Sequence, residues 1–507
     1  MKKKSLFAQL LAGFLLAAAV IAITGCGTVL YHEPAYTYAG RPYPPSGLLQ
    51  RVLVTYTTNG SSGAAQMLDG LRDLRGNIQD TIQSFPISGY SASYPNQIMN
   101  FPEQQRGYVY DRTGGVLTTI NYSTEASGGQ AASFGANSPS VDAEPNGTRF
   151  MGAVYSQGVL EVAGAGGSYI SLNLPGVYKV AINQGNSILL AMVQNSNTLY
   201  RVIKLPQTTN PVLPPGYIDC EPITLPVYCV VPVKGTFDHP YDAYFSLDGS
   251  SVFIMNCGPE CSGTTAGVTV LDPSMLQVDE IPTVAPLDAA APTAQKTLPV
   301  ANPIPVPGGA TIGLSDSNNL YVAGQQLQTT GTYSGLFAGN LSTINLTSYA
   351  VTSKISISDG THTRLLFADD STLWAGSTSC ANGVRAATAA TELSSGGVTD
   401  QAGDYNCLTR ISLAGTAPTA TIIPQVVQSS TSPVTVPYPN TNLNQYYYGD
   451  LAGICWVQNY HKVYTAYGGQ IHAFQTADGT EINNQYLTVQ GTVLDVAYMD
   501  AISNSAN

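Results

Sequence analysis

Positive charge is scarce in this chain. It carries 20 Lys and Arg against 32 Asp and Glu, a formal net charge of −12, and charged residues make up only 10% of the sequence. Beyond Lys2, Lys3 and Lys4 there is no run of basic residues. Because binding to a phosphate backbone needs clustered Lys and Arg, the composition excludes a nucleic-acid partner.

Recognisable catalytic motifs are also missing. The five histidines, His32, His239, His362, His461 and His472, form no His-x-x-x-His pair. The sequence has neither a Gly-x-Ser-x-Gly nucleophile elbow nor a Gly-rich phosphate loop. These absences argue against a zinc-protease helix, an α/β-hydrolase and a nucleotide-binding enzyme. The sequence therefore predicts no cofactor and no metal, and it favours a protein that is not an enzyme.

The amino terminus has the order of an export signal. Three lysines precede an apolar stretch from Leu6 to Ile23, and small residues then lead to a cysteine. The run Ile23-Thr24-Gly25-Cys26 resembles the lipobox of bacterial lipoproteins. The resemblance implies that residues 1–25 are a signal peptide, that they are removed, and that Cys26 is acylated as the first mature residue.

Two alternatives to lipidation stay open, because about 18 apolar residues can also span a bilayer, and a plain secretory signal needs no lipid. Lipidation would hold the chain stably, since several acyl chains on one residue bind a membrane better than one. Gly27 stands where some lipoproteins carry an aspartate that retains them at the inner membrane. The resemblance thus implies the bacterial cell envelope, at the outer membrane, facing the periplasm or the cell surface.

The mature chain would be long and acidic. Removal of residues 1–25, which hold three lysines and no acid, leaves 482 residues with a net charge of −15. Only repeat or closed β architectures keep one domain at that length. Fifty Gly, 32 Pro and 31 Tyr are typical of an extracytoplasmic all-β protein. We expect a Pro- and Tyr-rich tether over residues 26–50, a folded domain over 51–500 and a tail over 501–507.

Seven cysteines remain besides Cys26, and export would place them in an oxidising compartment. Nearest-neighbour pairing predicts three local disulfides, namely Cys220–Cys229, Cys257–Cys261 and Cys380–Cys407. Cys455 is left over in an apolar segment, where an inert buried thiol is expected. A metal site at Cys257 and Cys261 is the alternative, but nothing nearby supplies the other ligands.

One local pattern recurs along the chain: an apolar strand, a polar turn with Asp, Asn or Gly, and a second apolar strand. Its copies span residues 180–191, 243–255, 312–323, 365–375 and 454–466. A third strand follows several copies, at 267–272, 408–413 and 470–474. Recurring four-stranded units of roughly 40 to 65 residues indicate the blades of a single β-propeller.

The clearest copy also resembles a known repeat. Ser246-Leu247-Asp248-Gly249 followed by Val252 to Asn256 resembles the YVTN-type propeller repeat. Leu320 to Ala323 and Leu53 to Tyr56 are looser copies. The resemblance implies the fold more than the function.

The two ends of the chain predict how the ring closes. Arg51 to Tyr56 starts like a second strand without a first, and Gly491 to Tyr498 looks like a first strand without a blade after it. Their pairing would complete one blade and cover the exposed sheet edges. We count eight units and keep seven as the alternative. The units start near residues 51, 96, 147, 177, 241, 311, 364 and 452.

Four segments interrupt this pattern. Residues 64–80 suit a short helix, but the propeller context favours a strand, a turn and a fourth strand. The insertions 206–236, 284–307 and 425–446 are rich in Pro, Thr and Val. We expect them to project as loops, where function usually lies.

Candidate binding residues are few. His239 and His362 each precede an inner strand, and their ordinary role would be to turn the chain into that strand. The alternative is that both face the mouth of the central channel as ligands or bases. Tyr446, Tyr447 and Tyr448 lie beside an insertion and could form an aromatic contact surface for a partner.

Asp248, Asp369 and Asp370 occupy predicted hairpin turns, which Asp favours because its carboxylate bonds local backbone N–H groups. Calcium (Ca²⁺) binding would need more converging oxygens than one hairpin offers.

Two classes of function follow from the sequence. The first is a lipid-anchored cell-envelope propeller that acts as a binding or scaffold module for a protein or glycan partner, alone or within an envelope complex. The alternative is a lactonase- or hydrolase-like enzyme with a site at the mouth of the central channel. That enzyme would need Asp, Glu, Asn and His from several blades to converge on one face. The absence of a catalytic motif favours the binding module.

Overall fold

The fold was analysed in a computed structural model, which describes residues 41–48, 50–71, 73, 85–164, 169–206, 213–221, 227–395, 406–423, 449–482, 489 and 491–504. The expected signal peptide, Cys26, most of the expected tether and Tyr446–Tyr448 lie outside the described residues. All the strands and helices of the described residues belong to the unit from Pro44 onward.

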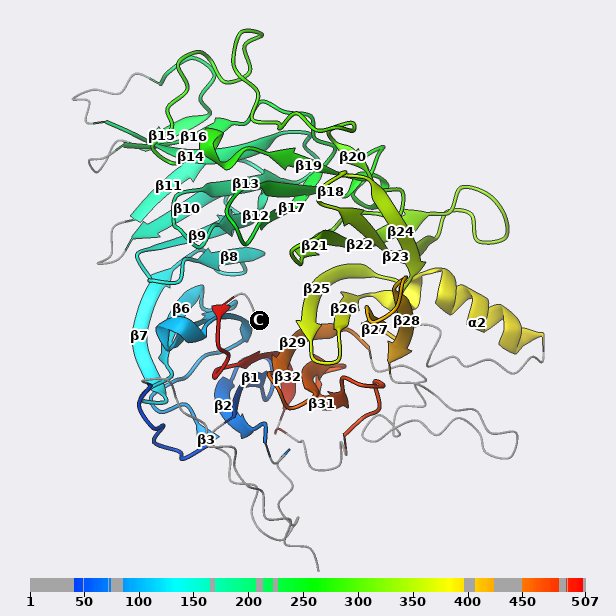
Figure 1. Cartoon of the computed structure of the whole chain (residues 1–507). Helices are drawn as coiled ribbons and strands as arrows, with labels where there is room; N and C mark the ends of the chain where they lie inside the picture. Colours follow the sequence, from blue (N-terminus) through cyan, green and yellow to red (C-terminus); the bar gives the residue numbers. More distant parts are fainter. Residues whose placement is uncertain are drawn as a thin grey trace, which may run out of the picture. The chain divides into compact units, whose positions relative to one another are not determined.

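Eight antiparallel sheets follow one another around a ring, as the order of labels and colours in Figure 1 shows. The eight-blade count is therefore confirmed and the seven-blade alternative is wrong. Blade one contains β32 (Thr492–Tyr498), β1 (Arg51–Thr57), β2 (Gly63–Asp69) and β3 (Phe85–Pro86). Blade two contains β4 (Pro95–Phe101), β5 (Arg106–Asp111), β6 (Val116–Asn121) and β7 (Ala126–Ser133). Blade three contains β8 (Ser140–Ala143), β9 (Arg149–Val154), β10 (Val159–Gly164) and β11 (Tyr169–Asn173).

Blade four has five strands, β12 (Val177–Ile182), β13 (Leu189–Val193), β14 (Leu199–Leu205), β16 (Val227–Pro232) and β15 (Asp219–Glu221). Blade five contains β17 (Pro240–Phe245), β18 (Val252–Asn256), β19 (Gly267–Leu271) and β20 (Ile304–Pro305). Blade six contains β21 (Ile312–Ser315), β22 (Asn319–Leu327), β23 (Phe337–Asn345) and β24 (Val351–Ser356).

Blade seven contains β25 (Thr361–Ala368), β26 (Thr372–Thr378), β27 (Leu408–Ser412) and β28 (Thr419–Ile423). Blade eight shows three strands in the described residues, β29 (Leu451–Val457), β30 (Lys462–Tyr467) and β31 (Gln470–Gln475). The described part of the chain adds one α-helix, α2 (Val384–Ser394), and four short 3₁₀ turns, η1 (Pro102–Gln104), η2 (Gly258–Cys261), η3 (Pro273–Met275) and η4 (Cys380–Asn382).

The core lies between the blades. In the described residues each of the eight neighbouring blade pairs shares its own cluster of buried apolar side chains. Full burial of one Val, Leu or Phe stabilises a fold by about 1.5–3 kcal/mol. Alternation of side chains along a strand lets both faces of each central strand contribute, which is why these segments read as short apolar runs. The clusters make the ring continuous.

The chain ends close the ring as expected. β1 pairs with β32 in antiparallel register, with Val52 opposite Tyr498 and Thr57 opposite Thr492. The guanidinium of Arg51 donates to both carboxylate oxygens of Asp500 and to Glu125 on the blade-two side. The side chains of these three residues are 6% exposed or less. We call β1, β32 and this ion network the closure seam.

The structure shifts three expected boundaries. Blade three begins with β8, whereas the unit predicted to start near residue 147 is its second strand. The short β8, with a serine and an aspartate among its four residues, gives little apolar signal. Insertion 206–236 supplies β15 and β16, and insertion 284–307 supplies β20, so neither is only a projecting loop. Residues 63–69 form β2, as the strand interpretation of 64–80 expected, and 74–80 lie outside the described residues.

The body also reaches back before Arg51. Ser46 donates through its backbone N–H and its hydroxyl to Glu125. Leu48 is buried in the cluster between blades one and two. The last residues of the expected tether therefore pack onto the ring.

Candidate functional site

The two faces of the ring carry different loops. We call the face at which the inner strands begin the upper face; the loops between the second and third strands of each blade also lie there. In five blades these loops are short, at residues 58–62, 112–115, 155–158, 194–198 and 468–469. In blades five, six and seven they span 257–266, 328–336 and 379–407, and 396–405 lie outside the described residues. We call these three loops the long-loop face.

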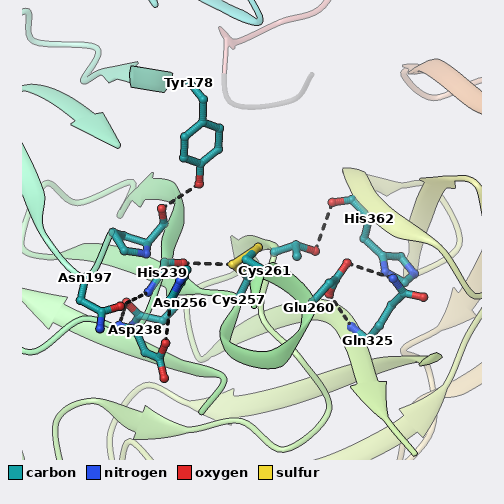
Figure 2. The surroundings of a disulfide bond; sticks show 12 residues. Tyr178, Asn197, Asp238, His239, Asn256, Cys257, Glu260, Cys261, Gln325 and His362 are labelled. Atoms are coloured by element: carbon teal, nitrogen blue, oxygen red, sulfur yellow. Dashed lines mark hydrogen bonds and ion pairs between the residues drawn. A yellow bond between two sulfur atoms is a disulfide. The ribbon is translucent and has the colours of Figure 1, made fainter. Parts of the chain in front are cut away.

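The blade-five loop is organised by Asp238 (Figure 2). Its carboxylate accepts hydrogen bonds from the backbone N–H groups of Thr264 and Thr265, from the Thr264 hydroxyl and from Nδ1 of His239. Partial burial works to raise the pKa of Asp238, but these hydrogen bonds outweigh it and lower the pKa to about 2. The disulfide Cys257–Cys261 closes the same loop. The loop is therefore fixed both covalently and by a charged anchor.

Glu260 connects this loop to the next two blades (Figure 2). Its carboxylate accepts from the backbone N–H and the side-chain amide of Gln325, both at 3.0 Å. The amide oxygen of Gln325 in turn accepts from the backbone N–H of Gly360, at 2.8 Å. Burial raises the pKa of Glu260 to about 7, and the bonds from Gln325 and Thr361 partly offset it. Blades five, six and seven are thus joined by one hydrogen-bonded line.

The blade-seven loop is closed by the disulfide Cys380–Cys407 and carries α2. Asp359 holds the start of this helix, because its carboxylate accepts from the backbone N–H groups of Arg385 and Gly339. The Arg385 side chain donates to the Ile357 carbonyl and to the Ser356 hydroxyl. The long-loop face is consequently anchored at both ends.

A second set of polar residues lies inside the ring. Six inner strands carry a β-bulge near their beginning, and a bulge re-aims the residue that follows it. The residues after the bulges are Gln97, Lys179, Asp242, Arg364, Gly453 and Asp495. Asp142 on β8 takes the same place without a bulge. We call these seven residues the channel belt.

The belt joins neighbouring blades. Asp495 accepts from the backbone N–H of Ile98 on β4 at 2.8 Å, and Asp142 accepts from that of Ile182 on β12 at 2.7 Å. Gln97 donates to the Val141 carbonyl at 3.1 Å. Burial is the main cause that raises the pKa of Asp142 and of Asp495, each to about 6, and their hydrogen bonds and nearby cations partly offset it.

Two ion pairs complete the belt. Lys179 lies 3.4 Å from Asp242 on the neighbouring inner strand. Arg364 lies 3.8 Å from Asp495, two blades away. The belt residue of the blade between them is Gly453, where a Cβ would stand 2.1 Å from Asp495 Oδ1. Glycine is therefore needed there so that Asp495 can occupy its place.

Two cavities open on the centre of the ring. The first has a volume of about 230 Å³ and is lined by inner strands alone, β4, β21, β25, β29 and β32. We call it the channel pocket; Arg364, Asp495 and Gln97 are among its lining residues. The second has a volume of about 600 Å³ and lies between the hairpin turns that follow the inner strands of blades four and five, on the face opposite the upper face. Asn504 of the C-terminal segment lies at its edge.

The two histidines singled out from the sequence are not brought together in either cavity. His239 has a left-handed backbone, with φ of 57°, and its ring bonds Asp238. His362 is fully buried, its Nε2 lies 3.0 Å from the Ser358 carbonyl, and burial lowers its pKa to about 4. His239 has the turn geometry expected of it, whereas His362 lies within β25 as a buried residue and does not precede the strand.

The cysteines and turn aspartates lie as expected. All three disulfides form, and Cys455 is a buried free thiol, whose pKa burial raises. Asp248 accepts from the Ser250 N–H within its hairpin turn. Asp369 and Asp370 accept from His461 of blade eight, which fixes one turn to the next blade.

The channel belt was missed in the sequence, although it has a signature. Gln97, Lys179, Asp242, Arg364 and Gly453 each stand six residues before a residue of the hairpin turn that follows their strand. A charged, amide or Gly residue four or five positions before each of these turns marks one level of the ring. The apolar residues of the strands dominate the sequence pattern, so this single polar or Gly position in each inner strand is not recognised from the sequence.

Two absences can be stated for the described ranges. Among them, no group of three or more His, Cys, Asp or Glu side chains is placed to hold a metal ion. Nor does any helix of those ranges have the length and apolar character needed to cross a membrane.

No family model matches the chain, and no curated protein matches it. Solved structures do. Dihydro-heme d1 dehydrogenase NirN, solved in complex with DHE, is similar with a TM-score of 0.51 and 13% identity, over 92% of this chain and 80% of that one. The Dos1 propeller has a TM-score of 0.45 and 8% identity over 82% and 88% of the two chains. A candidate 6-phosphogluconolactonase of Bacteroides fragilis has 0.43 and 12% over 89% and 97%. At these identities the likeness extends to the propeller fold alone.

Proposed function

We propose that the protein is a lipid-anchored binding module of the bacterial cell envelope, and that a protein or glycan partner docks on the long-loop face. The observation that carries the proposal is the asymmetry of the upper face. Three consecutive blades have long loops there, two closed by disulfides, while the other five have turns of two to five residues. A rigid, preorganised surface loses little conformational entropy on binding.

The chemistry of this face suits a neutral, polar partner. The tip of the blade-six hairpin carries exposed Thr329, Thr330 and Thr332 with a partly exposed Tyr333. Hydroxyl groups and tyrosine supply hydrogen bonds and contact area at low entropic cost. Three disulfides support an oxidising, extracytoplasmic compartment. The lipobox at Cys26 supports the anchor.

Site-specific photo-crosslinking in intact cells tests the docking surface. A photoreactive residue at Thr330, on the long-loop face, is expected to capture one discrete partner. Thr124 offers the matched control, because it is an exposed threonine in the turn between β6 and β7 on the opposite face. Equal capture at both positions, or capture at Thr124 alone, would contradict the proposal.

Metabolic labelling tests the anchor. Radiolabelled palmitate is expected to enter the wild type and to be absent from a Cys26→Ala variant. Label in both proteins, or in neither, would remove the lipid anchor and leave the docking surface to be judged by the crosslink.

A hydrolase-like enzyme is the second candidate, and Glu260 is the observation that favours it. Buried carboxyl groups with raised pKa values are candidate acids. Turnover of a lactone or ester panel that is lost in Glu260→Gln would move the assignment to the enzyme.

A further inference from the structure

The channel pocket holds an arginine whose hydrogen-bonding capacity is largely unused. Within the described residues the Arg364 guanidinium donates one hydrogen bond, from Nη1 to the Thr363 carbonyl at 3.2 Å. Its Nη2 stands 3.8 Å from Asp495, which is an ion pair without a hydrogen bond. The side chain is 35% exposed, and it lines the cavity. A guanidinium has five N–H donors, so several remain for a ligand.

Three acceptor oxygens at the pocket, by contrast, each already accept one hydrogen bond. Asp495 Oδ1 accepts from the Val496 N–H, and Oδ2 accepts from the Ile98 N–H. The amide oxygen of Asn100 accepts from the Tyr122 hydroxyl. The Thr363 hydroxyl and the Gln97 amide can each donate or accept. The unused N–H groups of Arg364 are therefore the main polar feature of the pocket, and they suit a ligand that accepts.

The rest of the wall is apolar, formed by residues of β4, β21, β25, β29 and β32. The apolar lining residues are Ile98, Ile312, Leu365, Leu366, Ile454, Val496 and Ala497. An apolar cavity of about 150 Å³ holds benzene. By proportion the 230 Å³ of the channel pocket accepts roughly nine non-hydrogen atoms.

We propose that the channel pocket binds a small organic monocarboxylate, whose carboxylate pairs with Arg364 and whose apolar body lies against the aliphatic wall. A planar carboxylate fits the fork of a guanidinium in a bidentate manner, which a sugar hydroxyl or an ammonium group does not. This site is separate from the long-loop face, so either can fail without the other.

The neighbouring charges predict how pH acts on the site. Arg364 on β25, Asp495 on β32 and Cys455 on β29 are the titratable side chains that line the pocket; β4 and β21 contribute none. Protonation of Asp495, whose pKa burial raises to about 6, changes the local charge from neutral to positive. An anion is therefore expected to bind more tightly at pH 5 than at pH 7.5, and binding to take up a proton.

Calorimetric titration of the purified full-length protein with three probes of similar size, benzoate, benzamide and benzylamine, tests the proposal. Benzoate is expected to bind with one-to-one stoichiometry, at least tenfold more tightly than either other probe. Arg364→Gln should weaken benzoate binding by about tenfold to a hundredfold, the loss of a hydrogen-bonded charge. Lys179→Gln removes the other belt cation, which lies outside the pocket, and should leave the affinity within twofold.

Arg364→Lys keeps the positive charge but lacks the planar guanidinium that can bind a carboxylate through two N–H groups. It replaces Arg364→Gln as the test if the glutamine variant does not fold. It should bind benzoate several-fold more weakly and keep the tightening at low pH. Benzamide or benzylamine binding as well as benzoate, unchanged affinity in Arg364→Gln, or no binding by the wild type would each overturn the proposal.

Discussion

The closure seam and the long-loop face are held together by different forces. At the seam, residues from opposite ends of the chain meet through backbone pairing and through Arg51, whose charge is buried between Asp500 and Glu125. On the long-loop face, disulfides join cysteines 4 and 27 residues apart in sequence. One region uses long-range, non-covalent contacts, and the other uses local covalent ones.

The difference in forces indicates that the closure seam and the long-loop face have different roles. The seam determines whether the ring exists, because an open ring would expose unpaired strand edges. The disulfides constrain the loops and fix their shape, and Cys380–Cys407 also lies within the cluster between blades seven and eight. We therefore expect damage at the seam to unfold the protein, and damage at the disulfides to change what the protein binds.

Arg51→Met is expected to have the largest effect. The substitution leaves Asp500 and Glu125 buried without their cation, and loss of one partner of a buried ion pair costs about 3–5 kcal/mol. Denaturant unfolding measures the loss. Arg112→Met, an exposed arginine in a short upper loop, is the control and should stay within about 0.5 kcal/mol. Equal stability of the two variants would mean that the seam does not depend on its charges.

Removal of the disulfides tests the role of the covalent contacts on the long-loop face. The chain-entropy model predicts a cost of about 3–4 kcal/mol for Cys380→Ser/Cys407→Ser and about 2 kcal/mol for Cys257→Ser/Cys261→Ser, because the first pair closes the longer loop. Both variants should keep a folded ring by circular dichroism and lose the crosslink at Thr330. If both variants keep the crosslink, partner binding does not depend on the disulfides.

Gly453→Ala tests the approach of blade eight to blade one. The new methyl group would lie 2.1 Å from Asp495 Oδ1 and 2.7 Å from the Val496 nitrogen. Overpacking of this kind costs about 1–3 kcal/mol, measured by thermal unfolding. Gly415→Ala is matched to it, because its nearest neighbour lies at 3.5 Å. If Gly453→Ala and Gly415→Ala have the same melting temperature, the contact between blade eight and Asp495 of blade one is less tight than the geometry shows.

Glu260→Gln should have the smallest effect, and the effect depends on pH. The pKa of Glu260 is raised from its ordinary 4.5 to about 7, so its contribution to stability is full below pH 4.5 and is lost as pH rises through 7. The melting-temperature difference between wild type and variant should therefore fall across that window. Asp248→Asn is the control, because hydrogen bonds lower the pKa of Asp248 below 3.8 and its contribution is constant over the same window.

The propeller could be predicted from the sequence because its signal is local. Apolar pairs of strands around an Asp or Asn turn, such as 243–255 and 365–375, became β17–β18 and β25–β26. The same rule failed at blade three, where β8 has only four residues, among them a partly buried Asp142. Close spacing likewise predicted the disulfides, since cysteines only a few turns apart have few other partners.

The candidate sites could not be predicted, because they depend on convergence. Arg364 and Asp495 are 131 positions apart, and only the closure of the ring brings them together across Gly453. Glu260 is an unremarkable residue of a Cys-Gly-Pro-Glu-Cys loop until Gln325 reaches it from the next blade. His239 and His362 were candidates because histidine is rare in this chain. In the fold each ring contacts a residue close to it in sequence, Asp238 and Ser358.

Hydrogen–deuterium exchange of the full-length protein, oxidised and then reduced, tests the central claim most directly. We predict that amides of β1 and β32 stay protected in both states, and that faster exchange after reduction is confined to the segments that carry the disulfides, which are 257–266, the described parts of 379–407 and the β15–β16 pair joined by Cys220–Cys229. Faster exchange of β1 and β32 to the same degree as the loops would contradict it, because the ring would then depend on the disulfides.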